Sequence, residues 1–257
     1  MTAPLVRAST PQAGVALLEL NRPEKRNALS NALLSEFAAT LAEAERAGMR
    51  CIVLTGSEAF FSAGADISEM RTRGYEAINN PSRNADWAAI ESFALPIVAA
   101  VRGICFGGGH ELAMLSDIVI ASDDARFGQP EIKLGIIPGD GATQRLTRLV
   151  GKPLAMKMIL TGDPIDAAEA LRAGLVAEVT PSARCLPRAI EIAAAIASRS
   201  GPALRLAKDA VLVAYETTLA EGLRTERRNI ALAFTTDDQK EGMAAFFEKR
   251  PPIFTGR

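Results

Sequence analysis

The stretch IVAAVRGICFGGGHELAMLSDIVIA, residues 97–121, decides the fold class of this chain. It begins with the apolar run Ile97 to Val101 and ends with a second one, Asp117 to Ala121, each short enough to form a buried strand. Between the two runs lies the turn Gly103 to Gly109, which leads into an apolar helical segment. Strands that alternate with helices in this way predict an α/β core.

The chain on the N-terminal side of this stretch shows the same alternation. Leu5 to Ala8 and Val15 to Leu20 predict a β-hairpin, and Cys51 to Leu54 predicts another buried strand. Ser30 is a favourable N-cap for a helix that we expect to reach about Ala47. These elements extend the α/β prediction through the N-terminal half of the chain.

From Thr143 onward the pattern is almost wholly helical, broken by one short strand predicted around Val176 to Val179. We therefore expect the helical tail to form an extension appended to the α/β core. The extension has more apolar positions than one small helical layer needs to hide, so they contact either the core or another subunit. These positions are Leu204, Ala207, Val211, Leu219, Leu223, Ile230, Phe234, Phe246 and Phe247.

Composition narrows the class of protein. Of the 257 residues 48% are hydrophobic, which is enough for a sizeable core, and the net charge of −1 provides no basic field for nucleic acid or an anionic membrane. Three widely spaced cysteines, Cys51, Cys105 and Cys185, are expected to be buried and reduced. With no apolar run that resembles a signal peptide or membrane span, we expect a cytoplasmic protein.

Three turns rich in glycine and small residues are candidate binding sites. They are Phe61 to Ile67, Gly107 to Met114, and Gln129 to Gly141. Small side chains leave backbone N–H groups open to an external oxygen, and the dipole of a following helix adds to their attraction. Each turn also has a plainer explanation, because surface turns and close packing of a helix on a strand both favour glycine.

Two glutamates in these turns are candidate acid–base residues. Glu111 lies in the first turn of a predicted helix, a position that capping and the helix dipole favour by themselves. Glu131 lies in an apolar, proline-bounded stretch where Lys133 is a candidate partner, and a solvated surface carboxylate is the ordinary alternative. His110, the only histidine, is expected to be packed or hydrogen-bonded, and it excludes a multi-histidine metal site.

Taken together, these stretches resemble the enoyl-CoA hydratase/isomerase (crotonase) family. The likeness covers nearly the whole chain, and the motifs occur in the order that the family has. They are Leu20–Pro23, Asn27–Leu29, Phe61–Ile67 with Glu69-Met70, Gly107–Leu112, Ser116-Asp117, Phe127–Gly135, Pro138-Gly139, Thr143–Leu146, Thr161-Gly162, Ala173–Val176 and Phe246–Arg250.

The resemblance implies a core built as a spiral of ββα turns in residues 1–195, with the active site, and a helical region in residues 196–257 that makes trimer contacts. The usual assembly in the family is a homotrimer or a hexamer that is a dimer of trimers. The family's oxyanion hole corresponds to the backbone N–H groups of Ala65 and Gly108, which would bind the thioester carbonyl of an acyl-CoA substrate. Coenzyme A is part of that substrate, so neither a separate cofactor nor a metal is implied.

The same resemblance implies that Glu111 and Glu131 bracket one water molecule. We expect Glu111 to act as the base and Glu131 as the acid, while the N–H of Gly139 helps to hold the water. Family members that only isomerise double bonds often keep one of these glutamates, and this chain has both. The resemblance therefore points to an enoyl-CoA hydratase, which adds water syn to a trans-2-enoyl-CoA to give a 3-hydroxyacyl-CoA.

Positions that would contact the CoA moiety also follow from the resemblance. They are Ala63, Gly64, Asp66, Ile67 and Ser68, together with Phe246 and Lys249 from a neighbouring subunit. Asp140 departs from many hydratases, and it lies near the position of the nucleophilic aspartate in the related 4-chlorobenzoyl-CoA dehalogenases. We interpret Asp140 as a helix N-cap or as a residue that adds polarity to the pocket.

Three alternatives to a hydratase stay open from the sequence. Within the family they are an isomerase and another CoA-thioester enzyme, such as a dehalogenase or a decarboxylase. Outside catalysis, the chain could be a binding protein with the same fold, as some RNA-binding relatives are, although its near-neutral charge argues against a nucleic-acid partner.

Overall fold

The computed structural model describes residues 3–71 and 73–257 and contains two sheets. The larger sheet has the order β1-β2-β3-β5-β7-β10, and apart from the antiparallel β1–β2 hairpin its neighbours are parallel. Its strands are β1 (Val6–Gln12), β2 (Val15–Leu20), β3 (Cys51–Thr55), β5 (Ile97–Val101), β7 (Ile118–Ser122) and β10 (Glu178–Thr180). The predicted α/β core is confirmed.

The smaller sheet consists of very short strands in the order β4-β6-β8-β9. They are β4 (Phe60–Ser62), β6 (Ile104–Phe106), β8 (Arg126–Gly128) and β9 (Ile165–Asp166). The pairs β3–β4, β5–β6 and β7–β8 each place one strand in the larger sheet and the next strand in the smaller one. Since neighbouring pairs stack in parallel, the chain winds as a spiral of ββα units, as the resemblance implied.

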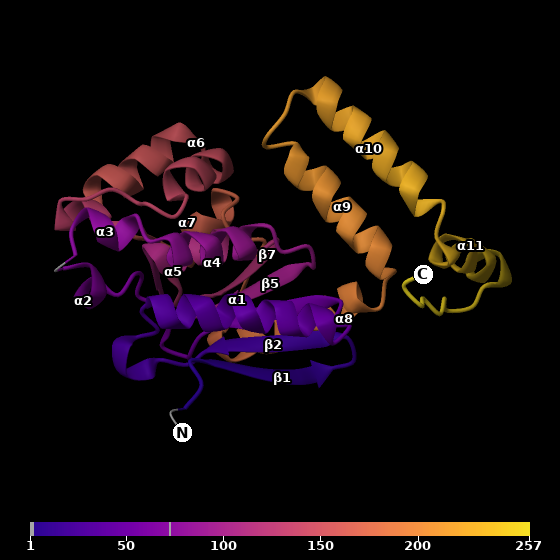
Figure 1. The fold of residues 1–257 in the computed structure, drawn as a ribbon, viewed down its shortest axis with the longest axis horizontal. Helices are drawn as coiled ribbons and strands as arrows, with labels where there is room; N and C mark the ends of the chain where they lie inside the picture. The colour runs from indigo at the N-terminus through magenta and orange to yellow at the C-terminus, as the bar shows by residue number, and fades with distance from the viewer. Residues whose placement is uncertain (1–2, 72) are drawn as a thin grey trace.

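Helices follow these strand pairs and cover the larger sheet (Figure 1). The helix α1 begins after Ser30, whose hydroxyl accepts a hydrogen bond from the N–H of Leu33, so the predicted N-cap is confirmed. The helices of this part of the chain are α1 (Asn31–Arg46), α2 (Ile67–Met70), α3 (Tyr75–Ile78), α4 (Pro81–Glu91), α5 (Gly108–Met114), α6 (Ala142–Thr161) and α7 (Ala167–Arg172).

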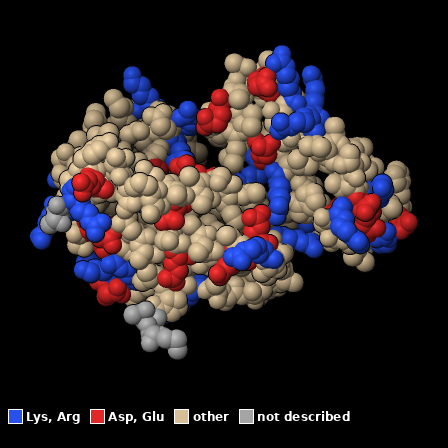
Figure 2. Space-filling model, viewed as in Figure 1, with Lys and Arg blue, Asp and Glu red and all other residues tan. Residues whose placement is uncertain are grey.

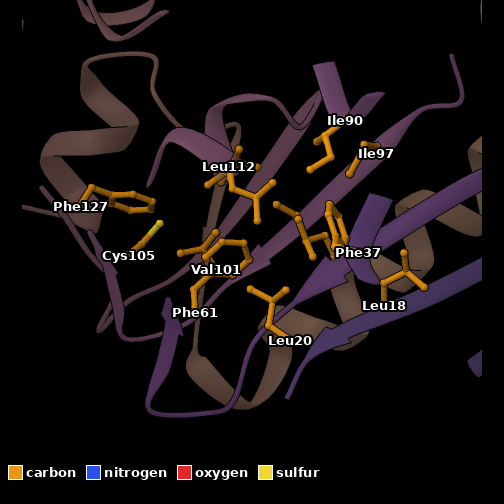
Figure 3. Close-up of a cluster of buried hydrophobic side chains, with 14 of the residues drawn as sticks. Leu18, Leu20, Phe37, Phe61, Ile90, Ile97, Val101, Cys105, Leu112 and Phe127 are labelled. Atoms are coloured by element: carbon orange, nitrogen blue, oxygen red, sulfur yellow. The ribbon is translucent and has the colours of Figure 1, made fainter. Parts of the chain in front are cut away.

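The core lies between the larger sheet and these helices (Figure 3). Phe37 from α1, Leu18 from β2 and Leu112 from α5 are 0%, 0% and 1% exposed and belong to the same apolar cluster. Leu112 follows Glu111 in the sequence, so the burial of the Leu112 side chain holds the first turns of α5 in place. Full burial of one such side chain stabilises the fold by roughly 2–3 kcal/mol.

The C-terminal helices divide into two groups. Helix α8 (Ser182–Ala197) packs on the opposite face of the larger sheet, where Cys185 and Ala189 join the second core cluster. The following helices, α9 (Gly201–Val213), α10 (Leu219–Ala233) and α11 (Asp237–Glu248), extend away from the core (Figure 1; Figure 2 shows the same view as a space-filling model). Many of their apolar side chains are exposed, and α9 has no buried residue at all.

Not every local prediction agrees with the structure. The turn predicted at Gly103 to Gly109 contains strand β6. The polar stretch that follows Ala65, up to about Trp87, has a helical pattern in the sequence, and the structure forms the short helices α2, α3 and α4 there. The sequence predicts separate helical segments that begin near Thr143 and Pro153, and this is confirmed: within α6, Gly151 has a φ of 76° and a ψ of 160°, which are not helical and divide the range into two segments. Three-residue strands and one-turn helices are too short to show a periodic pattern, which explains why these features were missed. No helix in the described ranges is both long and apolar enough to span a membrane.

Candidate active site

Glu111 is the most deeply buried carboxylate of the candidate site. It lies in the first turn of α5 and is 1% exposed. Its Oε1 atom accepts hydrogen bonds from the N–H of Asp140 at 2.9 Å and the N–H of Ala142 at 2.8 Å. Ala142 is the first residue of α6, so the carboxylate of Glu111 binds at the N-terminus of a second helix, where an anion is favoured.

Glu131 approaches the same turn from a short 3-10 helix, Pro130–Leu134, that follows β8. A Cβ atom placed on Gly107 would lie 2.9 Å from Oε1 of Glu131, so a larger residue at position 107 would displace this carboxylate. Gly107 also has a φ of +52°, which L side chains rarely adopt. The structure thus brings the two predicted glutamates together at the start of α5.

Gln129 connects Glu131 to the only histidine. With the amide in the orientation that satisfies both neighbours, Gln129 donates to the two carboxylate oxygens of Glu131 at 2.9 and 3.1 Å and accepts from Nδ1 of His110 at 3.2 Å. Burial lowers the pKa of His110 to about 4, so the imidazole is neutral at pH 7. His110 is therefore a packed, hydrogen-bonded side chain, as the sequence predicted.

Two backbone N–H groups border the glutamates. A parallel bridge pairs Leu29 with Ala65, and this bridge brings Ala65 to the start of α5: a Cβ on Gly108 would lie 3.4 Å from the nitrogen of Ala65. The bridge uses the carbonyl of Gly64 and the N–H of Asp66. Neither the N–H of Ala65 nor that of Gly108 donates a hydrogen bond within residues 3–71 and 73–257, so both are available to donate to a ligand oxygen.

Asp140 lies between Glu111 and helix α4. Its carboxylate is paired with the guanidinium of Arg83, and its carbonyl oxygen accepts a hydrogen bond from Nη1 of Arg145 at 3.0 Å. The interpretation of Asp140 as a helix N-cap is wrong, because Gly141 is the N-cap of α6 and no side chain caps it. The pocket-polarity interpretation agrees with the structure, since the side chain of Asp140 faces the candidate site.

Burial and neighbouring charge change the acidity of the glutamates. Desolvation, followed by the charge of Asp140, raises the pKa of Glu111 to about 7. The charge of Glu131 raises it further, while the hydrogen bonds from Ala142 and Asp140 lower it. Desolvation also raises the pKa of Glu131. Two such carboxyls can hold one proton between them near neutral pH, which suits them to proton transfer.

The raised pKa of Glu111 predicts a pH-dependent cost in stability. From the ordinary value of 4.5 to about 7, the folded chain holds a proton that the unfolded chain has lost. Relative to the state in which Glu111 is ionised, the stability that this proton gives to the folded chain is fully present below pH 4.5 and is lost as the pH rises through 7. We expect Glu111→Gln, which can still accept both amide bonds, to be more stable than the wild type by about 3 kcal/mol at pH 8 and by much less at pH 5. Urea unfolding at fixed protein concentration measures this difference, and an equal difference at both pH values would contradict it.

The predicted CoA-contact residues occupy two separate places. Ala63, Gly64, Ile67 and Ser68 follow β4 beside the turn of Gly107 and Gly108, whereas Asp66 is already engaged as the N-cap of α2 and in an ion pair with Arg22 at 2.7 Å. Phe246 is 78% exposed, and it lies with Lys249 at the end of α11, far from α5 (Figure 1). Within one chain, the structure does not bring these last two residues to the glutamates.

Other predicted features are settled by direct contacts. Lys133 pairs with Asp163 at 2.9 Å rather than with Glu131, because the side chain of Glu131 turns inward to Gln129. All three cysteines are buried and unpaired, as predicted. Among the described residues there is no cluster of three or more potential metal ligands.

Sequence reasoning gave no role to four residues that shape the site: Gln129, Arg83, Arg145 and Trp87. The guanidinium of Arg83 lies 5.9 Å from the centre of the Trp87 ring, and Arg145 donates to Glu91 of α4 at 2.9 Å. The acidic partners of Arg83 and Arg145 lie 57 and 54 positions away along the chain. No local sequence pattern indicates such long-range pairs.

Comparison with known proteins agrees with the site. The family model described as Enoyl-CoA hydratase/isomerase matches residues 10–257. The chain is 48% identical over 244 residues to a probable enoyl-CoA hydratase of Mycobacterium leprae, with 95% of each chain covered. It is 47% identical over 247 residues to the 2,3-dehydroadipyl-CoA hydratase of Escherichia coli, covering 96% of this chain and 97% of that one.

The fold of this chain also matches that of a solved structure. The crystal structure of an enoyl-CoA hydratase from Bacillus anthracis superposes with a TM-score of 0.93 and 38% identity, covering 98% of this chain and 100% of the other. Sequence and structure therefore agree over nearly the whole length. On these matches, the chain belongs to the enoyl-CoA hydratase/isomerase family.

Proposed function

We propose that this protein is an enoyl-CoA hydratase, which adds water syn across the double bond of a trans-2-enoyl-CoA to give a 3-hydroxyacyl-CoA. The observation that carries the proposal is the convergence of Glu111 and Glu131 on one turn beside the free N–H groups of Ala65 and Gly108. The relatives named as hydratases, at 47–50% identity, support the same reaction.

In this proposal the thioester carbonyl accepts hydrogen bonds from the N–H groups of Ala65 and Gly108. These donors stabilise the negative charge that develops on the oxygen as the enolate forms, and each contributes roughly 3 kcal/mol to lowering the barrier. They are backbone groups held by the Leu29–Ala65 bridge and the start of α5, so they need little reorganisation during the reaction.

The two glutamates then move protons on one face of the double bond. Glu111 accepts a proton from water while the water oxygen bonds to C3, and Glu131 donates a proton to C2. Transfer of one proton from Glu111 back to Glu131 restores the starting state, so the overall change is the addition of one water molecule. A pKa of about 7 at Glu111 makes its carboxylate a stronger base than an ordinary glutamate, and about half of the molecules carry it ionised at pH 7. The N–H of Gly139 is proposed to hold the water.

The CoA moiety is proposed to lie along Ala63 to Ser68, with Phe246 and Lys249 supplied by a neighbouring subunit. Two features support this arrangement: α11 lies far from α5 in its own chain, and α9 to α11 expose apolar side chains that a homotrimer or hexamer would cover. We accordingly propose residues 1–195 as the catalytic core and residues 196–257 as the oligomerisation region. The buried, unpaired thiols support the cytoplasm as the proposed location.

Hydration is tested by offering trans-2-enoyl-CoA esters from C4 to long chains and following the loss of the conjugated thioester absorbance. We expect kcat/KM within the usual enzyme range of about 10⁴–10⁸ M⁻¹s⁻¹ for the best chain length. Absence of turnover across the whole panel would contradict the proposal. In that case 3-enoyl-CoA esters test for an isomerase, and a nucleic-acid shift assay at physiological salt tests for a binding protein.

A further inference from the structure

Asp140 is connected to Glu111 through its backbone and to the rest of the molecule through its side chain. Its N–H donates to Oε1 of Glu111 at 2.9 Å, while its carboxylate pairs with Arg83 of α4. Its carbonyl oxygen accepts from Arg145, which also bonds Glu91 of α4 at 2.9 Å. The N–H, the carboxylate and the carbonyl oxygen of Asp140 therefore connect Glu111 to helices α4 and α6.

The Asp140–Arg83 pair is nearly enclosed. The two side chains are 10% and 11% exposed, so their charges are only weakly screened by solvent. A Cβ on Gly108 would lie 3.8 Å from Oδ2 of Asp140, which places this carboxylate next to the amide proposed to bind the thioester oxygen. An uncompensated anion there would oppose negative charge on both the substrate and Glu111. Arg83 supplies the compensating charge.

We propose that Asp140 and Arg83 act together as positioning residues for Glu111: the amide of Asp140 orients the Glu111 carboxylate, and the balance of the two opposite charges sets how readily that carboxylate holds a proton. The inference rests on the proposed hydration reaction for its consequence in catalysis. The side chains of Asp140 and Arg83 come from segments 57 residues apart along the chain.

The charged and titratable groups around Glu111 come from every element that packs on it. His110 and the thiol of Cys105 are neutral near pH 7, since burial lowers the pKa of the former and raises that of the latter. The remaining groups are Glu131 from the 3-10 helix, Asp140 from the loop, Arg83 from α4 and Arg145 from α6. Of these, Asp140 contributes the largest charge effect on the pKa of Glu111.

Two substitutions with opposite charge effects test the proposal. Asp140→Asn keeps the backbone amide and removes the anion, so the pKa of Glu111 is expected to fall by about half a unit or more. Arg83→Gln leaves the anion of Asp140 without its partner, so the pKa of Glu111 is expected to rise by a similar amount. The double variant, which removes both charges, is expected to lie between the two single variants.

The ionisation of Glu111 is measured by infrared difference spectroscopy over a pH series, with the carboxyl band assigned by its loss in Glu111→Gln. The limb of the pH profile of kcat/KM that Glu111 controls should move in the same direction in each variant, with kcat changed by at most about tenfold because the amide bond remains. Arg148→Gln, an exposed arginine on α6, is the matched control for loss of a positive charge and should leave the titration unchanged.

Shifts of opposite sign in the two single variants would support the proposal. Shifts in the same direction, or no shift accompanied by lower activity, would overturn it and leave Asp140 a purely structural residue. The infrared titration does not require turnover, so it still reports on Glu111 if no enoyl-CoA is hydrated. Failure of the positioning role and failure of the hydratase proposal are therefore distinguishable.

Discussion

Glu111→Gln and Glu131→Gln are each expected to lower kcat for hydration by roughly 10²–10⁴-fold. Glutamine keeps the size and the hydrogen-bonding oxygen of glutamate, but it can neither accept the proton of water nor donate a proton to C2. Because Oε1 of Glu111 accepts two backbone hydrogen bonds at 2.8 and 2.9 Å, an amide oxygen at the same place should preserve the local structure. The loss would therefore report on proton transfer.

Steady-state hydration of a C4 enoyl-CoA measures this effect, and thermal unfolding checks that each variant is folded. Glu43→Gln, an exposed glutamate on α1, is the matched control and should retain full activity. The double variant should be little worse than the worse single variant, since both groups serve the same step. Full hydration activity in Glu111→Gln would be inconsistent with its role, and retention of isomerisation alone would identify an isomerase.

Gly108→Pro is the second substitution for which we expect a large loss. Gly108 is the first residue of α5, the helical position where proline is best tolerated because its N–H has no partner within the helix. Proline removes that one donor and places its ring where the thioester oxygen is proposed to bind. Loss of a single oxyanion-hole donor should lower kcat by roughly 10²–10³-fold.

Gly108→Ala is the matched control, because it adds a Cβ and keeps the N–H. The nearest atoms to that Cβ would be the nitrogen of Ala65 at 3.4 Å and Cδ1 of Leu29 at 3.6 Å, which are close but tolerable contacts. We expect the alanine variant to lose much less activity than the proline variant, with both showing native circular dichroism. Equal activity in the two variants would argue against a role for the Gly108 amide.

Much of the fold could be predicted because burial leaves a local pattern. The strands β3 and β5 are short apolar runs with every residue buried, and the helix after Ser30 carries both its cap and its apolar face in adjacent positions. The strands of the smaller sheet could not be predicted in this way. Strands of two or three residues, such as β6 and β9, are stabilised by pairing with neighbours distant in the sequence rather than by their own propensity.

The sequence by itself determined the α/β alternation and the glycine-rich turns, because each depends on residues that are close together along the chain. The resemblance to the family, rather than any local pattern, selected Glu111 and Glu131 as a pair. Only the tertiary structure decided that Glu111 and Glu131 share one turn, that Lys133 pairs with Asp163, and that Arg83 neutralises Asp140. These pairings depend on how the ββα units stack. The acidity of Glu111 likewise follows from its burial and from the charge of Asp140, 29 residues away, and neither is visible in the local sequence.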